Sequence, residues 1–498
     1  MKNAYDILII GAGLGGLECA YILSKKGYKV CVLEKNKNIG GTLQNFQHGS
    51  CTFSSGMHYL GSLDEGQVLN KFFRYFNILD GLDLKRMNPD GFDRFSIGSN
   101  EYAYPMGWDF FEKKMSTYFP EEKSAVSAYV KLMKKVADSQ DIYNLRQFNG
   151  NDIRLNEYLK TGIYPAIKNI TKNKNLQNAL CALNFVYAGD KNTSSLYAHA
   201  LINNYYVQSA YRLKRGSGQI AELLAKNIHH NGGEIFTQKE VDQFIFKADQ
   251  LSGIETKSGE IYSADHIISN VHPATTMKMI AHGKLRKSFR NRLTNIPNTI
   301  SVFGVHISLK PNTFPALDYN FYAYKNDDVW TVSAYNEKKW PEFYYLYTPA
   351  SDAENSFAGC VSLYSYMHFD EVKKWADRSA EFRGHDYEEW KNLKAEKLID
   401  LASQRFPDLK TSIVDYITAT PLTYRDYIGT PMGAMYGTLR DYHDPMSSYV
   451  FPRTKLPNLY FTGQNINLHG MLGVSISSLM TCGEFLGLNK LIKEVNEA

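Results

Sequence analysis

The start of the chain alternates between short apolar runs and a segment with helical spacing. The apolar run at residues 7–10 predicts a buried strand, which leads into a glycine-rich turn at residues 11–16. Residues 17–26 predict a helix, and a second apolar run at residues 28–33 predicts another strand. This order is typical of a βαβ unit with a parallel sheet.

The turn after the first strand reads Gly11-Ala12-Gly13-Leu14-Gly15-Gly16. Gly11 allows the tight turn, Gly13 lets the backbone approach a pyrophosphate, and Gly16 lets the helix pack against the strand. The free N–H groups of the helix N-terminus favour the phosphates. Glu34 ends the second strand, 21 residues after Gly13, where a carboxylate accepts hydrogen bonds from ribose hydroxyls. The alternative, a glycine turn in an unrelated α/β unit, is disfavoured by the complete pattern.

A second glycine pair, Gly40-Gly41 followed by Thr42, comes shortly after Glu34. Beyond it the βαβ rhythm stops, and residues 53–61 predict an extended loop that includes His58. A domain that binds only NAD would continue with alternating strands and helices. The change in pattern therefore favours FAD, held along its whole length.

The C-terminal end holds a further set of signals. Residues 457–465 predict a strand that delivers a polar loop, and residues 470–487 predict a helix. Between these ends, residues 213–235 predict a glycine turn, a helix, a cap and a strand. A β-meander and a strand that re-enters the sheet are predicted after that, at residues 241–246, 251–256, 260–262 and 264–270.

The remaining residues lack these signals and hold most of the aromatic side chains. The chain has 498 residues, whereas single cores stop growing at ~250–300 residues, so at least two domains are expected. The fold class predicted is α/β (α+β): a Rossmann-like FAD-binding domain with an inserted substrate-binding domain. The FAD-binding domain is assigned to residues 1–80, 206–275 and 421–498, and the substrate-binding domain to residues 81–205 and 276–420.

Residues 120–136 predict an amphipathic helix in the first insertion. Its apolar positions keep helical spacing, and lysines follow another face. The apolar positions are Val126, Tyr129, Val130, Met133 and Val136. A basic amphipathic helix can lie on a membrane surface. An ordinary cap helix with a solvated polar face is the favoured alternative, because lysine faces are common.

Composition narrows the class of protein. The 44% apolar and 21% charged content is that of a globular chain and excludes collagen-like and disordered proteins. The net charge of +5 is too small and too dispersed to argue for a nucleic-acid partner. Aromatic residues make up 13%, with 35 Tyr and 27 Phe, which is typical of a protein that lines a large apolar cavity, although aromatic rings also fill ordinary cores.

Cysteine and hydropathy patterns bear on the compartment. The 6 cysteines lie far apart in sequence and no His/Cys group has zinc-ligand spacing, so we expect neither a disulfide framework nor a metal site. No apolar run approaches the ~18–20 residues of a spanning helix, and the N-terminus does not read as a signal peptide. We therefore expect a cytoplasmic protein in a reducing compartment.

Together, the glycine turn, the glutamate that closes the second strand and the second glycine pair resemble the N-terminal signature of the flavin-containing amine oxidase and phytoene desaturase superfamily. The run N-L-Y-F-T-G-Q-N-I-N-L-H-G-M-L-G-V-S-I-S-S-L-M-T-C-G-E at residues 458–484 is most similar to the retinol saturase and carotenoid isomerase branch. Residues 195–206 and 420–437 resemble the same branch. One departure is Ser54, which stands where the branch usually has an acidic residue.

The resemblance implies that the final helix aims its N-terminus at the flavin pyrimidine edge, where its dipole stabilises reduced flavin. It also implies that a valine at position 241 touches the adenine through its backbone. The FAD contacts implied in this way are Gly11, Gly13, Leu14, Gly15, Gly16, Glu34, Lys35, Gly41, Thr42, Val241, Gly463, Gln464, Met471, Gly473 and Val474.

The chemistry implied is that of an FAD-dependent oxidoreductase acting on C=C bonds of a long apolar polyene or isoprenoid lipid, by saturation, desaturation or isomerisation. Saturation needs one proton beside the hydride from the flavin, and His58 and His469 are the candidate catalytic residues for it. Tyr59, Tyr205, Tyr206 and Tyr427 could also donate, but cavity lining is favoured for them. The substrate is expected to be lipid-like and drawn from a membrane by a protein that touches its surface.

Two alternatives belong to other classes of protein. A flavin amine oxidase is the first, but its aromatic cage and its flavin-linked lysine or cysteine have no clear counterpart in the sequence. The second is a non-catalytic isoprenoid-lipid escort of the GDP-dissociation-inhibitor type, which shares the fold. An escort has no need of a pyrophosphate cradle or of a helix aimed at a flavin.

Overall fold

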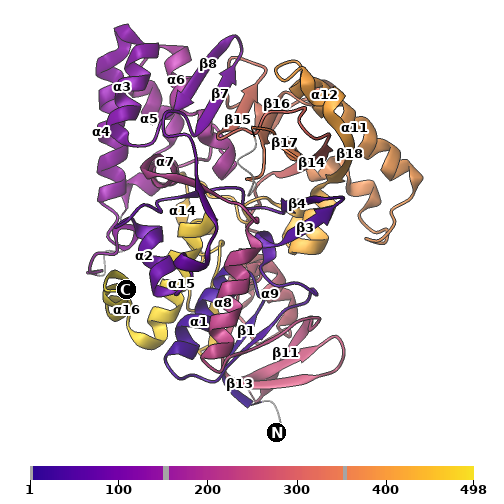
Figure 1. Ribbon diagram of the computed structural model, residues 1–498. Coiled ribbons are helices and arrows are strands. Elements are labelled where there is room, and N and C mark those ends of the chain that lie inside the picture. The colour runs from indigo at the N-terminus through magenta and orange to yellow at the C-terminus, as the bar shows by residue number, and fades with distance from the viewer. Residues whose placement is uncertain (1–3, 150–155, 249, 351–355) are drawn as a thin grey trace.

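The computed structural model describes residues 4–149, 156–248, 250–350 and 356–498. One sheet and its helices form the lower part of the molecule in Figure 1, around β1 and β13. A second sheet, with β14 to β18, forms the upper right, and helices α3 to α6 form the upper left. The fold is mixed α/β, as the sequence predicts.

The first sheet combines strands from three distant parts of the chain. Its order is β10-β2-β1-β13-β12-β11, with β19 also paired to β13. The strands around β1 are parallel, whereas β11, β12 and β13 form the predicted antiparallel meander. The bounds are β1 (Ala4–Ile10), β2 (Val30–Leu33), β10 (Glu234–Phe236), β11 (Val241–Lys247), β12 (Gln250–Thr256), β13 (Ile261–Ser269) and β19 (Leu459–Phe461).

One strand prediction in this sheet is wrong. The sequence predicts separate strands at residues 260–262 and 264–270, but β13 is continuous from Ile261 to Ser269. Ser263, at the expected break, pairs with Ala4 on one side and Gly253 on the other. Pairing on both edges holds the residue extended, so the polar interruption in the sequence does not end the strand.

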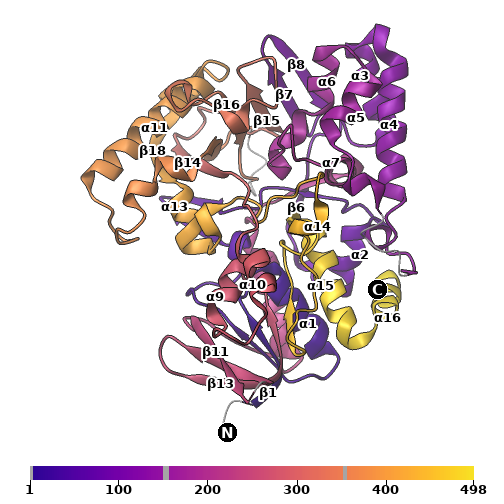
Figure 2. The same ribbon diagram turned by 180° about the vertical axis from the view of Figure 1, so that it is seen from behind.

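Alternation along β1 and β2 divides two hydrophobic cores. Ile7 and Ile9 face the core formed with α1, α8 and α15, while Leu8 and Ile10 face the core formed with α9 and α10. The parallel strands are therefore buried on both faces, which explains their continuous apolar sequence. The helices are α1 (Leu14–Lys25), α8 (Gly218–His230), α9 (Pro273–Met279), α10 (Lys287–Thr294) and α15 (Gly470–Leu486). Figure 2 shows α9 and α10 on the side turned away in Figure 1.

The second sheet joins strands from both predicted insertions. Its order is β18-β14-β17-β16-β15-β7-β8, and all neighbours are antiparallel except the parallel pair β7 and β15. The domain boundaries predicted from the sequence stay a prediction. The bounds are β7 (Asp93–Ile97), β8 (Asn100–Tyr104), β14 (Ser301–Leu309), β15 (Asn320–Tyr324), β16 (Phe343–Tyr347), β17 (Cys360–Met367) and β18 (Ile413–Ala419).

Helices cover this second sheet. The helix predicted over residues 120–136 is observed as a short 3-10 turn followed by α4, and all five of its apolar positions are buried. Because this face packs in the protein's own core, it is not free to lie on a membrane. The helices are α3 (Trp108–Tyr118), α4 (Lys123–Asp138), α5 (Ile163–Ile170), α6 (Lys174–Leu180), α7 (Leu196–Gln208), α11 (His385–Ser403) and α12 (Asp408–Ser412).

Smaller elements connect the two parts. Residues 53–61, predicted as an extended loop, contribute to two short strands at their ends, because residues 45–54 form a hairpin and residues 60–61 pair with β9. The short strands are β3 (Asn45–His48), β4 (Cys51–Ser54), β5 (Leu60–Gly61), β6 (Leu84–Arg86) and β9 (Ala210–Leu213). The remaining helices are α2 (Val68–Tyr75), α13 (Pro421–Thr423), α14 (Pro445–Ser448) and α16 (Leu488–Asn496). In the described ranges, no helix is both long and apolar enough to cross a bilayer.

Candidate active site

The glycine turn between β1 and α1 has the geometry of a phosphate cradle. Gly11 has a φ of +95°, which a residue with a side chain adopts only with strain. A Cβ on Gly16 would lie 2.1 Å from the carbonyl oxygen of Gly11, so α1 can approach the strand only with glycine there. Gly13 lies just before α1 as its N-cap residue. The turn therefore leaves the first backbone N–H groups of the helix uncovered by side chains, as a bound pyrophosphate requires.

Glu34 and the second glycine pair close this turn from the other side. The Glu34 carboxylate accepts hydrogen bonds from the backbone N–H groups of Ala12, at 2.8 Å, and Asn36, at 2.9 Å. The N–H of Gly40 donates to the carbonyl of Ala12 at 2.7 Å, and a Cβ on Gly41 would lie 3.3 Å from Gly13 Cα. Both glycine segments thus lie side by side.

The two chain ends meet at the same place. A Cβ on Gly15 would lie 2.9 Å from Gly463 Cα, which follows β19. The Ser478 hydroxyl, on α15, donates to the Gly15 carbonyl at 3.3 Å. The amide of Asn270 donates to the Gly11 carbonyl at 3.2 Å and joins the end of β13 to this junction. These contacts bring together residues more than 400 positions apart in the 498-residue chain.

One large cavity begins at this junction and extends between the two sheets. Its empty volume, including its open mouth, is about 1440 Å³. Among the residues predicted to contact FAD, those in its wall are Leu14, Thr42, Gln464, Met471, Gly473 and Val474. The first turn of α15 therefore faces the cavity and presents its positive dipole end to it.

The other predicted FAD contacts lie outside the cavity wall. Gly11, Gly13, Gly15, Gly16, Gly41 and Gly463 form the junction described above, and Glu34 lies next to it. The N–H of Lys239 donates to the Glu34 carbonyl at 2.8 Å, which brings the segment leading into Val241 beside Glu34. Lys35 is exposed, and its ammonium donates to the carbonyl of Asp426 at 2.8 Å.

The far wall of the cavity is aromatic. Of the described residues that line it, none has a charged side chain. Its rings come from Tyr59, Phe185, Tyr205, Tyr206, Tyr322, Tyr345, Tyr364, Tyr424 and Tyr436. Three of the four tyrosines considered from sequence, Tyr59, Tyr205 and Tyr206, do line the cavity. Tyr427 does not, and it is 55% exposed.

Both candidate catalytic histidines lie in the wall, but burial keeps them neutral. Desolvation, and then the neighbouring His306 and Arg212, lower the pKa of His58 to about 3, and its Nδ1 has no partner among the described residues. Burial lowers the pKa of His469 to about 4. His469 Nε2 lies 3.0 Å from the Val186 carbonyl, which can only accept, so Nε2 holds the proton. Proton delivery by these histidines stays a prediction, and their neutrality disfavours it.

A buried polar network behind the wall is not predicted from the sequence. Tyr59 Oη donates to Asp93 Oδ2 at 3.0 Å, and the Asn320 amide donates to Asp93 Oδ1 at 2.8 Å. Arg212 donates to Asn320 Oδ1 at 2.8 Å, and Tyr345 donates to the same oxygen at 3.2 Å. The only sequence signal is Arg212, a charge inside the otherwise apolar β9, whereas Asp93 is followed by a second charge, Arg94, in β7 and does not stand out.

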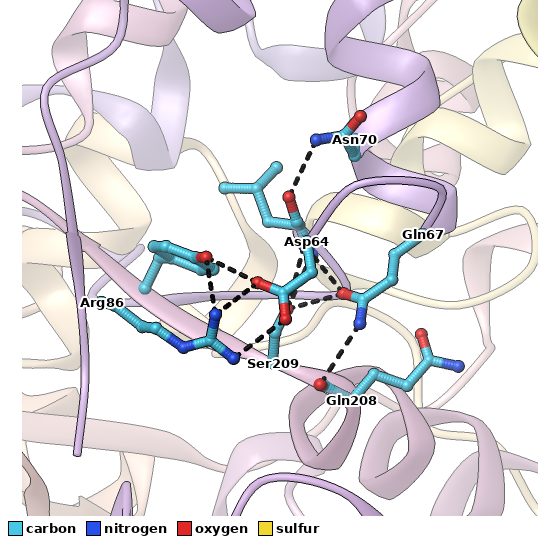
Figure 3. A network of polar contacts seen from close by, with 8 residues as sticks. Asp64, Gln67, Asn70, Arg86, Gln208 and Ser209 are labelled. Atoms are coloured by element: carbon cyan, nitrogen blue, oxygen red, sulfur yellow. Dashed lines mark hydrogen bonds and ion pairs between the residues drawn. The ribbon is translucent and has the colours of Figure 1, made fainter. Parts of the chain in front are cut away.

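A second network supports the segments that supply Tyr59 and the end of α7 (Figure 3). Arg86 donates to both carboxylate oxygens of Asp64, at 3.1 and 2.9 Å, and Tyr211 donates to Asp64 at 2.5 Å. The Ser209 hydroxyl donates to Gln67 at 2.7 Å. Because Asp64 follows β5 and Ser209 follows α7, the network fixes the loop after Tyr59 against the helix end with Tyr205 and Tyr206.

Comparison with known proteins agrees with this geometry. A family model described as an NAD(P)-binding Rossmann-like domain matches residues 9–76. The all-trans-retinol 13,14-reductase of Macaca fascicularis is 26% identical, over 97% of this chain and 86% of its own length. Prolycopene isomerase 1, chloroplastic, of an Oncidium hybrid cultivar is 24% identical, over 96% of this chain and 83% of its own.

The fold is also found among solved structures. Wild-type putrescine oxidase bound to putrescine has a TM-score of 0.66 and 13% identity, covering 99% of both chains. At this identity the likeness concerns the fold. The similarity to retinol reductases and prolycopene isomerases extends over nearly the whole chain, and it confirms the resemblance inferred from the glycine turn and residues 458–484.

Proposed function

We propose that this chain, a relative of the retinol 13,14-reductases and prolycopene isomerases, is an FAD-dependent oxidoreductase that acts on C=C bonds of a long apolar polyene or isoprenoid lipid. The observation that supports this most directly is the one continuous cavity described above. It joins the first turn of α15 and the glycine junction to a wall of aromatic rings without a charged side chain among the described residues. A polyene is apolar and extended, so such a wall suits it.

The residues at the junction fit FAD. The glycine turn has no Cβ where a pyrophosphate would approach, and Glu34 keeps oxygen lone pairs free for ribose hydroxyls beside the two N–H groups that it accepts. We assign the adenine to the segment at Val241 and the pyrimidine edge to the start of α15. Bound there, the flavin would supply a hydride for C=C chemistry. The chain positions the substrate and excludes water.

The two alternatives fit the cavity less well. An amine substrate is a cation at neutral pH, yet no carboxylate lines the described wall, and burying a cation without a partner is costly. A lipid escort would use the apolar wall but has no need of a pyrophosphate cradle such as the turn at Gly11 and Gly13 beside Glu34. Neither alternative explains both ends of the cavity.

An anaerobic spectrum tests the proposal. The purified protein should show flavin absorbance, which is bleached by dithionite, and addition of a retinol or a carotenoid in detergent should restore it as the polyene is consumed. Return of the oxidised spectrum identifies saturation. Isomerised polyene with flavin that stays reduced identifies isomerisation, and reduction of oxidised flavin by the polyene identifies desaturation. Absence of bound flavin after reconstitution with FAD would refute the proposal.

We further propose that the protein works in the cytoplasm and takes its substrate from a membrane surface. The apolar cavity supports a membrane as the source of the substrate, because a long polyene is stored in bilayers rather than in water. The cytoplasm is the expectation from the scattered cysteines. Sedimentation with phosphatidylcholine vesicles, with and without retinol, measures the association. Recovery of all protein in the supernatant under both conditions would contradict it.

A further inference from the structure

We propose that Asp93 stores a proton behind the cavity wall and that Tyr59 passes this proton to the substrate. This inference rests on the proposed function, because saturation of a C=C bond needs a proton as well as a hydride. It assigns the proton to a pair of side chains other than the two histidines, both of which are neutral rather than cationic at neutral pH.

The pair is built for transfer. Asp93 is fully buried, at 0% exposure, at the start of β7, and does not itself line the cavity. Tyr59 does line it, and its hydroxyl lies 3.0 Å from Asp93 Oδ2 and 3.2 Å from the Tyr322 hydroxyl, which also belongs to the wall. Asn320 holds the other Asp93 oxygen at 2.8 Å. A proton on Asp93 therefore reaches the cavity through one hydroxyl group.

Asp93 has no ion-pair partner among the described residues to keep it charged. The nearby Arg212 guanidinium donates its hydrogen bonds to the carbonyls of Leu317, Tyr319 and Thr348 and to the side chain of Asn320. Burial dominates and raises the pKa of Asp93 to about 7, against the hydrogen bonds from Asn320 and Tyr59 and the positive charge of Arg212. The titratable or charged groups that face it are Tyr59, Tyr104, Tyr206, Tyr322, Tyr324, Tyr345 and Arg212.

Tyr59 cannot act without Asp93. Burial, and then the neighbouring Asp93, raise the pKa of Tyr59 well above its usual range, so a free phenolate is strongly disfavoured. When Asp93 is protonated, its O–H can donate to Tyr59 Oη, and the Tyr59 proton is released to turn towards the cavity. A proton that leaves Tyr59 is then replaced at once from Asp93.

The step balances with reduced flavin as the two-electron donor. Bound reduced flavin would supply the hydride that forms one new C–H bond, so the flavin would be oxidised and the alkene reduced by two electrons. The Tyr59 O–H bond breaks as the second C–H bond forms, and the Asp93 O–H bond breaks as the Tyr59 oxygen regains a proton. Asp93 is left as a carboxylate and takes a proton from solvent before the next turnover. In the assay, dithionite reduces the flavin.

The test compares Asp93→Asn and Tyr59→Phe with the control Tyr344→Phe. Tyr344 is a buried tyrosine outside the cavity wall, and its hydroxyl has no partner among the described residues. Because general acid catalysis contributes ~100-fold or more, Asp93→Asn and Tyr59→Phe should slow flavin reoxidation by the polyene about 100-fold, with unchanged substrate affinity. The wild-type rate should fall as pH rises through about 7, where Asp93 loses its proton. This dependence should vanish in Asp93→Asn, while Tyr344→Phe keeps it.

An infrared titration tests the proton on Asp93 without any reaction. A protonated carboxyl has a C=O stretch that the carboxylate lacks, and in the wild type it should disappear between about one pH unit below and one above 7. Glu18, the other buried carboxyl with a raised pKa, of about 8, also contributes, so Glu18→Gln identifies its share. Asp93→Asn should remove the component that titrates near 7. An unchanged infrared titration in Asp93→Asn overturns the inference.

The outcomes separate the inference from the proposed function. If no polyene reoxidises the wild-type flavin, the proposed function fails, and with it the transfer step. If the wild type reacts and Asp93→Asn reacts equally fast with the same pH profile, only the inference fails. Thermal unfolding and flavin content establish whether the variants fold. Asp93→Asn is expected to fold, because the amide it introduces can still accept a hydrogen bond from one neighbour and donate one to the other.

Discussion

Replacement of Gly16 by alanine tests how the glycine turn packs helix α1 against β1, separately from how the turn binds a pyrophosphate. The added Cβ would lie 2.1 Å from the carbonyl oxygen of Gly11, whereas non-bonded heavy atoms rest at ~3.5–4.0 Å. The clash is with backbone in a turn already at a φ of +95°, so no side-chain rotation relieves it. Helix α1 must move away from β1 by about 1 Å or more.

The cost follows from overpacking. Forcing a methyl group into a packed site costs ~1–3 kcal/mol, and a contact with backbone belongs at the upper end of that range. We therefore expect Gly16→Ala to lower the free energy of unfolding by about 2–3 kcal/mol. If FAD binds only after the displaced turn is forced back, its affinity falls by about 30- to 140-fold, because each ~1.4 kcal/mol is a factor of ten.

Two further variants make the comparison decisive. Gly13→Asp places a carboxylate at the N-cap position, where its nearest neighbour is the flexible Asn270 side chain, so it should strip flavin with little loss of stability. A Cβ on Gly359 would meet no atom within 4 Å, so Gly359→Ala should change neither the stability nor the flavin content. Urea unfolding of the protein without added FAD and the flavin released on denaturation measure the two effects. Full flavin content and wild-type stability in Gly16→Ala would refute the close approach of α1 to the strand.

Three other changes test the remaining assignments. Glu34→Gln removes the charge that accepts from Ala12 and Asn36, so flavin content after gel filtration should fall while the fold is kept; full retention would exclude a role for the carboxylate. Burial lowers the pKa of His58 to about 3 and of His469 to about 4, so these histidines take up protons in the unfolded chain at a higher pH than in the folded protein. The free energy of unfolding should therefore fall as pH drops from about 6.5 towards 4. His469→Gln should reduce that slope, as urea midpoints across this range would show, and an unchanged slope would contradict it. Asp64→Ala frees the loop after β5 from Arg86 and Tyr211, so proteolysis there should accelerate; the exposed Asp109→Ala is its control.

The cofactor half of the molecule is local enough to predict from sequence. The strand, turn, helix and second strand lie within the first 34 residues of the chain, and the closest glycine contact, of Gly16 with the Gly11 carbonyl, is made within this unit. The apolar spacing of α4 likewise appears in the sequence, because one face of a helix repeats every three or four residues. The predicted break in β13 is wrong, since pairing on both edges of that strand overrides its polar residues.

The second sheet could not be predicted from the sequence in the same way. Every residue of β14 and β16 is buried, so alternation between apolar and polar positions is lost. β7 pairs in parallel with β15, more than 200 positions away, and nothing in either segment specifies that partner. Asp93 and Asn320, which are bonded to each other, are brought together by this pairing alone.

The arrangement of charge around the cavity shows why the chemistry is hard to see from sequence. The described wall holds no charged group, yet two fully buried carboxyls lie one layer behind it. Asp93 accepts from Tyr59, and Glu18 accepts from Ser475 at the start of α15, at 2.6 Å. Burial raises both pKa values, to about 7 and about 8. Asp93 reaches the cavity wall through the Tyr59 hydroxyl, whereas Ser475 is not part of the described wall. The wall thus gives an apolar substrate an apolar surface and still keeps the exchangeable proton of Asp93 within reach.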